Sequence, residues 1–95
     1  MLDQTVEKIA LNDISEGLAL FGPQDKYLQL IEKNAKCNIN TREAEIVLQG
    51  NEKEVRILHH LFEVLLKLIR SGNTLTERDV LYAVDLAKTF RADEL

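Results

Sequence analysis

Residues 51–72 read NEKEVRILHHLFEVLLKLIRSG. Apolar residues recur there at intervals of three and four, the spacing that lines one face of an α-helix, and they are Val55, Leu58, Leu61, Phe62, Leu65, Leu66 and Ile69. Asn51 followed by Glu54 resembles a capping box, and Gly72 is a typical helix terminator. The pattern predicts a helix over residues 51–71 whose apolar face must be covered by a sheet or by another helix.

Two alternating segments precede this helix and predict a β-hairpin. Residues 36–41 place Cys37, Ile39 and Thr41 on one face, and residues 44–49 place Ala44, Ile46 and Leu48 on one face. The connection at residues 42–43 is short enough to pair the two segments antiparallel. A weaker alternation over residues 5–11 predicts a further strand, so we expect a three-stranded sheet.

The segment between the first strand and the hairpin predicts two short helices. Asp13 is a plausible N-cap for the first helix, whose expected inner face is formed by Ile14, Leu18 and Phe21. Gly22-Pro23 ends that helix, and Pro23 is suited to open a second one with Asp25 in its first turn. The expected inner face of the second helix is formed by Tyr27, Leu30, Ile31 and Ala35.

A last helix is predicted from Thr76 to about Phe90. Thr76 and Asp79 have the spacing of a capping box, and Leu75 is placed to pack on Val80 across the first turn. The remaining residues, 91–95, are small and charged, which is typical of a linker or a frayed end.

Composition indicates one small soluble domain. The chain has 95 residues, 45% of them hydrophobic, a net charge of −4 and a single cysteine. No apolar stretch is long enough to span a membrane, and the N-terminus lacks the form of a signal peptide, so we expect a cytoplasmic protein without a membrane partner. The absence of a strongly basic segment means that attraction to nucleic acid would be local rather than global.

The candidates for catalytic chemistry are few. None of the four glycines begins the Gly-x-x-x-x-Gly-Lys-Ser/Thr loop that holds ATP phosphates, so we expect neither ATP nor Mg²⁺ on this chain. His59 and His60 are adjacent on a helix, diverge by about 100°, and are poor joint ligands of one metal ion. His59 is expected beside the core and His60 in solvent, while Cys37 is expected to be a small buried hydrophobe.

The order strand, helix, Gly-containing turn, helix, strand, strand, long helix resembles the type I KH domain, a small nucleic-acid-binding fold, over about residues 5–71. The segment Leu20-Phe21-Gly22-Pro23-Gln24-Asp25 lies where that family has a Gly-x-x-Gly loop between two helices. The resemblance implies an α+β fold, a KH-like βααββα domain with a three-stranded sheet, helices on one face and an extra C-terminal helix.

A more specific resemblance covers nearly the whole chain. It rests on Ala19-Leu20-Phe21-Gly22-Pro23-Gln24-Asp25, on Leu28 and Leu30-Ile31-Glu32, on residues 46–50, and on Leu75-Thr76-Glu77-Arg78-Asp79-Val80 with Ala83. These residues resemble the N-terminal KH-like domain of PhoH-like proteins, the phosphate-starvation-inducible P-loop ATPase family. The resemblance implies a non-catalytic accessory domain over residues 1–91, with residues 92–95 beginning the linker to an ATPase domain that would carry ATP and Mg²⁺.

The expected nucleic-acid-binding residues are Gly22, Pro23, Gln24, Asp25, Lys26, Lys33 and Lys36. A Gly-x-x-Gly loop lets backbone amides approach phosphates closely, whereas here Asp25 adds a side chain and a negative charge and Pro23 removes an amide donor. Two functions therefore remain open from sequence. One is weak binding of single-stranded RNA in the service of the ATPase, and the other is a protein-interaction or homo-oligomerisation module that regulates the ATPase without binding nucleic acid.

Overall fold

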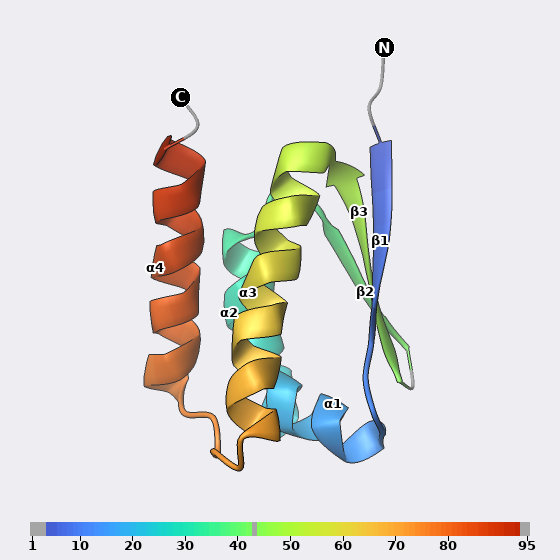
Figure 1. The fold of residues 1–95 in the computed structure, drawn as a ribbon, viewed down its shortest axis with the longest axis vertical. Helices are drawn as coiled ribbons and strands as arrows, with labels where there is room; N and C mark the ends of the chain where they lie inside the picture. Colours follow the sequence, from blue (N-terminus) through green and yellow to red (C-terminus); the bar gives the residue numbers. More distant parts are fainter. Residues whose placement is uncertain (1–3, 43, 94–95) are drawn as a thin grey trace.

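The computed structural model describes residues 4–42 and 44–93. Its elements, in chain order, are β1 (Gln4–Ala10), α1 (Ile14–Phe21), the 3₁₀ turn η1 (Pro23–Asp25), α2 (Lys26–Asn34), β2 (Asn38–Arg42), β3 (Glu45–Asn51), α3 (Glu52–Arg70) and α4 (Glu77–Asp93). The fold is α+β, as the sequence predicted. The helices lie to one side of the sheet, with α4 outermost (Figure 1).

The three strands form an antiparallel sheet in the order β1-β3-β2. β3 is the central strand, and its Ile46 and Leu48 are fully buried. Ile46 lies opposite Ile9 on β1, and Leu48 lies opposite Ile39 on β2. The predicted antiparallel hairpin is confirmed, and its inner face is confirmed at Ile39, Ile46 and Leu48. Thr41 and Ala44, which were assigned to the same face, are exposed near the turn. β3 runs to Asn51, two residues beyond the predicted end at residue 49.

Helix α3 is the centre of the core and packs against β1, β3, α1 and α4. Six of the seven apolar residues that predicted it are buried, and Ile69 is half-buried near its C-terminal end. Asn51 caps the helix, although its Oδ1 accepts from the amide of Lys53 at 2.9 Å rather than from that of Glu54. At the other end, the amides of Gly72 and Asn73 donate to the carbonyls of Ile69 and Leu68, which is a Schellman motif.

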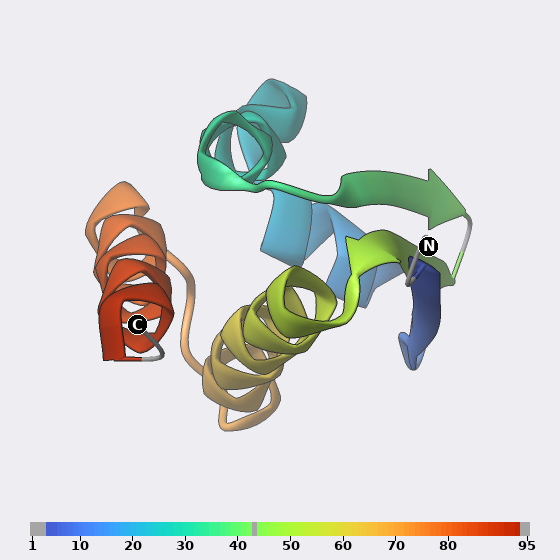
Figure 2. The same cartoon turned by 90° about the horizontal axis from the view of Figure 1, so that it is seen from above.

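Helix α4 packs on α3 and α2 and not on the sheet (Figure 2). The predicted capping box is confirmed, since the Thr76 amide donates to Asp79 Oδ2 at 3.0 Å and the Asp79 amide donates to Thr76 Oγ1 at 3.3 Å. Leu75 and Val80 are both buried, as expected for a hydrophobic staple. The helix continues to Asp93, three residues beyond the predicted end near Phe90, because nothing between these two residues breaks a helix. Residues 94 and 95 lie outside the described residues.

The predicted inner face of α1 is wrong for Ile14 and Leu18, whereas Phe21 is half-buried against the core as expected. Ile14 and Leu18 are 59% and 69% exposed, and the buried residues of this helix are Glu16, Gly17 and Leu20. The N-cap prediction holds, because Asp13 Oδ1 accepts from the Glu16 amide at 3.0 Å. The helix is turned so that fully buried Leu20 enters the core and Glu16 faces the end of α3.

Glu16 is tied to α3 by an ion pair with Arg70. Arg70 Nε and Nη2 donate to the two carboxylate oxygens at 2.7 and 2.9 Å, and the backbone and side-chain nitrogens of Asn12 donate to the same oxygens at 2.9 and 3.0 Å. The Arg70 hydrogen bonds are the main cause that lowers the pKa of Glu16 from 4.5 to about 2. The four donors compensate the burial of this carboxylate.

Replacing Glu16 with Gln should lower the free energy of unfolding by about 2 kcal/mol at pH 7, because charge-assisted hydrogen bonds to a poorly exposed carboxylate are lost. The folded pKa lies below the unfolded one, so this stabilisation is complete above pH 4.5 and disappears as the pH falls toward about 2. Urea unfolding at pH 7 and pH 3 measures both effects. Glu52→Gln, which breaks the exposed pair with Arg56, is the matched control and should change stability by less than about 0.5 kcal/mol. Equal losses in the two variants would contradict the assignment.

Candidate nucleic-acid interface

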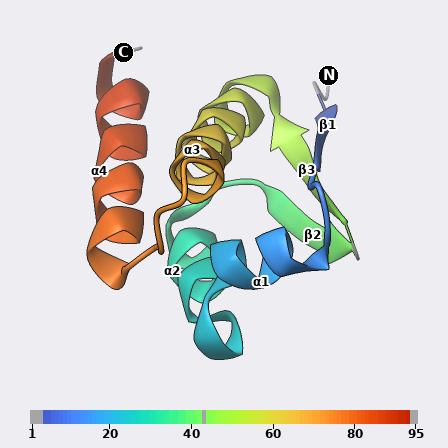
Figure 3. The ribbon, with the colours of Figure 1, turned by 60° about the horizontal axis from the view of Figure 1, so that its bottom comes forward.

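The connection between α1 and α2 contains the candidate loop Gly22-Pro23-Gln24-Asp25. It projects from the end of the molecule at which α4 begins (Figure 3). Gly22, Gln24 and Asp25 all have positive φ, of 80°, 54° and 59°. Pro23 therefore opens a 3₁₀ turn rather than the predicted α-helix, and Asp25 precedes α2 without capping it. Two adjacent non-glycine residues in the left-handed region mark a strained backbone.

Gly22 is required where it stands. Its φ and ψ of 80° and 177° lie in a region that only glycine occupies readily, and a Cβ at this position would lie 2.5 Å from Cδ2 of Tyr27. The Tyr27 ring thus packs directly on the Gly22 backbone. Its hydroxyl donates to the Leu75 carbonyl oxygen at 3.1 Å, so the loop is connected through Tyr27 to the segment before α4.

Lys26 is the first residue of α2 and lies next to the loop. Its Nζ is 2.9 Å from Oε1 of Glu77, the first residue of α4. The hydrogen bond to Glu77, together with the negative charge of that carboxylate, raises the pKa of Lys26 above its usual 10.5. Both side chains stay about half-exposed, so the ammonium group is paired and still reachable from solvent.

The other two predicted lysines lie away from the loop. Lys33 is exposed in the last turn of α2, and Lys36 is exposed in the connection that leads to β2. Because α2 has nine residues and rises about 1.5 Å per residue, roughly 13 Å separates its two ends. The structure therefore brings Gly22 to Lys26 together and places Lys36 at the opposite end of the helix, with Lys33 between them.

Several residues near the loop were not predicted as part of the site. Glu77 and Leu75 come close to it only through tertiary packing, and no local pattern in the sequence could have identified them. Ile14 and Leu18 were assigned to the core because their spacing fits an inner helical face as well as an exposed one. They form an exposed apolar pair on α1, the helix that leads into the loop.

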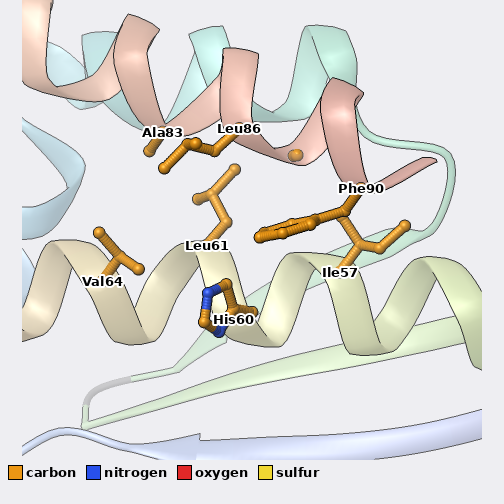
Figure 4. Close-up of a pocket in the computed structure, with 8 residues that line it drawn as sticks. Ile57, His60, Leu61, Val64, Ala83, Leu86 and Phe90 are labelled. Atoms are coloured by element: carbon orange, nitrogen blue, oxygen red, sulfur yellow. The ribbon is translucent and has the colours of Figure 1, made fainter. Parts of the chain in front are cut away.

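No small-molecule site is evident between α3 and α4 in the described ranges. The cavity there, bordered by Leu61, Val64, Ala83 and Leu86 among others, has a volume of about 10 Å³, which is too small for a ligand, and its largely apolar lining gives a water molecule few partners (Figure 4). Phe90 and His60 close one side with ring centroids 5.3 Å apart at 73°. His60 is exposed as predicted, and it also makes an edge-to-face contact with Phe90 that the sequence did not predict.

The remaining candidate groups do not assemble a reactive site. His59 borders the core as predicted, with its nitrogens 3.6 Å from Glu7 and 3.5 Å from Glu63. Among residues 4–42 and 44–93, no three His, Cys, Asp or Glu side chains lie close enough to hold a metal ion. Cys37 is half-buried just before β2, so the expectation of a buried cysteine is corrected. No helix within those ranges has the length and apolar character needed to cross a membrane.

The fold defines a small α+β domain with a three-stranded antiparallel sheet and four helices. A solved structure of a protein of unknown function from Aeropyrum pernix has the same fold, with a TM-score of 0.73 and 15% sequence identity over 99% of this chain and 52% of that one. In sequence, the chain is 44% identical over 78 residues to a PhoH-like protein of Bacillus subtilis (strain 168), which relates it to PhoH-like proteins.

The match covers most of this chain but only a small part of the Bacillus protein. The matched residues are 82% of this chain and 24% of the Bacillus protein, so the chain spans about a quarter of the relative's length. A scan against models of protein families found no match.

Proposed function

We propose that this chain is a KH-like, non-catalytic accessory domain of a PhoH-like protein, and that it binds single-stranded RNA weakly through Gly22 to Lys26. The similarity to part of a PhoH-like protein and the βααββα order of the six strands and α-helices from β1 to α3 support this assignment. ATP and Mg²⁺ would be bound by a separate ATPase domain, to which this domain would supply RNA. Both domains would be located in the cytoplasm.

The exposed loop at the start of α2 is the observation that carries the proposal. Residues 23–26 are all exposed, and the left-handed conformations of Gln24 and Asp25 turn the chain sharply between two helices. Lys26 supplies a cation where the helix begins, and the exposed apolar side chains of Ile14 and Leu18 offer contacts for bases on the preceding helix. A phosphate and its neighbouring base would thus find complementary groups on adjacent elements.

Titration of labelled single-stranded RNA at 50 and 200 mM salt tests the proposal. With one phosphate neutralised by Lys26 and a slope near −0.7, the affinity should fall only about two- to threefold between these concentrations. Amide chemical shifts should move at residues 22–26. Shifts confined to α4, or an affinity that is absent at 50 mM salt, would contradict RNA binding by the loop.

Replacing Asp25 with Gly should tighten RNA binding about fivefold. The substitution removes a negative charge from the phosphate path, and at a φ of 59° glycine adopts the required backbone without strain. Asp25→Asn is the matched control, because it removes the charge and keeps the side chain. An intermediate gain for Asn would show that both charge and close backbone approach matter, whereas unchanged affinity in both variants would mean that the loop does not contact RNA.

A second candidate is a protein-interaction or homo-oligomerisation module. Apolar side chains are exposed on two separate helices, Ile14 and Leu18 on α1 and Leu81 and Tyr82 on α4. The net charge of −4 also opposes long-range attraction to nucleic acid. Analytical ultracentrifugation over a wide concentration range tests this reading: self-association that Leu18→Glu or Tyr82→Glu abolishes, without RNA binding by the unmodified chain, would favour it.

A further inference from the structure

The first residue of α4 meets the first residue of α2 beside the candidate loop. Glu77 Oε1 lies 2.9 Å from Lys26 Nζ, and the two side chains are 48% and 56% exposed. Lys26 is the cation nearest to the loop in sequence, and Glu77 places a carboxylate on it in the way that a phosphate oxygen would be placed.

The position of Glu77 is held by contacts on both sides of it. The Tyr27 hydroxyl donates to Leu75 O, and Leu75 is buried against the core. Immediately after Leu75, the reciprocal hydrogen bonds between Thr76 and Asp79 fix the first turn of α4. Because the backbone on each side is anchored, the Glu77 carboxylate stays within reach of Lys26.

We infer that Glu77 is an intramolecular competitor of nucleic-acid phosphate for Lys26. This inference rests on the proposed RNA binding. A phosphate that approaches the loop meets an ammonium group already paired with a carboxylate, and the second negative charge repels it. Binding therefore exchanges one anion for another at Lys26. By linkage, a bound phosphate weakens the contact between α2 and the start of α4 to the same degree that the contact weakens binding.

The test compares Glu77→Gln with Asp85→Asn in the full chain, with single-stranded oligouridylate as the probe. Asp85 is exposed on the same helix, and both substitutions remove one negative charge. An exposed ion pair is weak, so freeing Lys26 should tighten binding by up to about fivefold in Glu77→Gln, with a smaller change in Asp85→Asn. In a Lys26→Gln background, the gain from Glu77→Gln should shrink to that of Asp85→Asn, since the competition then has no target.

The outcomes separate the inference from the function beneath it. If the unmodified chain binds the probe and Glu77→Gln binds no more tightly than Asp85→Asn, Glu77 is not a competitor, while RNA binding stands. A Glu77→Gln gain that persists in full without Lys26 would also overturn the inference. If neither the unmodified chain nor Glu77→Gln binds the probe, the proposed function fails, and the competition falls with it. Thermal unfolding of each variant verifies that the fold is retained.

Discussion

Leu65→Ala is expected to lower the free energy of unfolding by about 2 to 5 kcal/mol, the range for removing a large aliphatic side chain from a packed interior. Leu65 lies in α3, the central helix of the core, and has no solvent-exposed surface. The substitution removes apolar contacts and leaves a cavity that surrounding elements fill only in part. Equilibrium unfolding in urea, monitored by circular dichroism, measures the loss.

Leu18→Ala is the matched control because the chemical change is identical. Leu18 is 69% exposed on α1, so its truncation should change stability by less than about 0.5 kcal/mol. The comparison tests the orientation of α1 as well as the position of Leu65. A large loss at Leu18 together with a small one at Leu65 would mean that both helices have been assigned the wrong inner face.

Gly22→Ala is expected to cost about 3 kcal/mol or more and to abolish the proposed RNA binding. Backbone strain in this glycine-only region contributes about 1 to 3 kcal/mol, and the new Cβ would overlap the Tyr27 ring, 2.5 Å from Cδ2 and 2.6 Å from Cγ. Cγ of Tyr27 is bonded directly to its Cβ, so rotation of the ring about the Cβ–Cγ bond leaves Cγ in place and cannot relieve the overlap. Displacing the ring also breaks its hydrogen bond to Leu75 and disturbs the loop that carries Lys26.

Gly72→Ala separates the two causes of that loss. Gly72 also has positive φ, at 93°, but a Cβ there would meet no atom within 4 Å. Its replacement should therefore cost only about 1 kcal/mol, from backbone strain alone, and leave RNA binding unchanged. Equal destabilisation at the two glycines, measured by urea unfolding, would show that the Tyr27 contact contributes nothing.

The elements with strong local signals were predictable, for identifiable reasons. A long apolar periodicity predicted α3, and two polar residues at the right spacing predicted the cap of α4, since these patterns depend on residues within one or two turns of each other. The alternation around Ile46 and Leu48 likewise predicted which face of β3 is buried. The loop at residues 22–25 was predicted as a break between helices, although its conformation was not, because non-glycine residues seldom adopt left-handed geometry and nothing in the local sequence marks Gln24 for it.

By itself, therefore, the sequence determined an α+β domain, its strands, its two long helices and the loop that separates the two short ones. Tertiary structure decided which face of α1 is buried, because Arg70, from the distant end of α3, supplies two of the four hydrogen-bond donors that stabilise the poorly exposed Glu16 carboxylate. It also decided that Glu77 meets Lys26, through the packing of α4 on α2. Ion pairs between residues far apart in the chain produce no periodic pattern in the sequence, because their free energy depends on a distance between charges that only the folded structure determines.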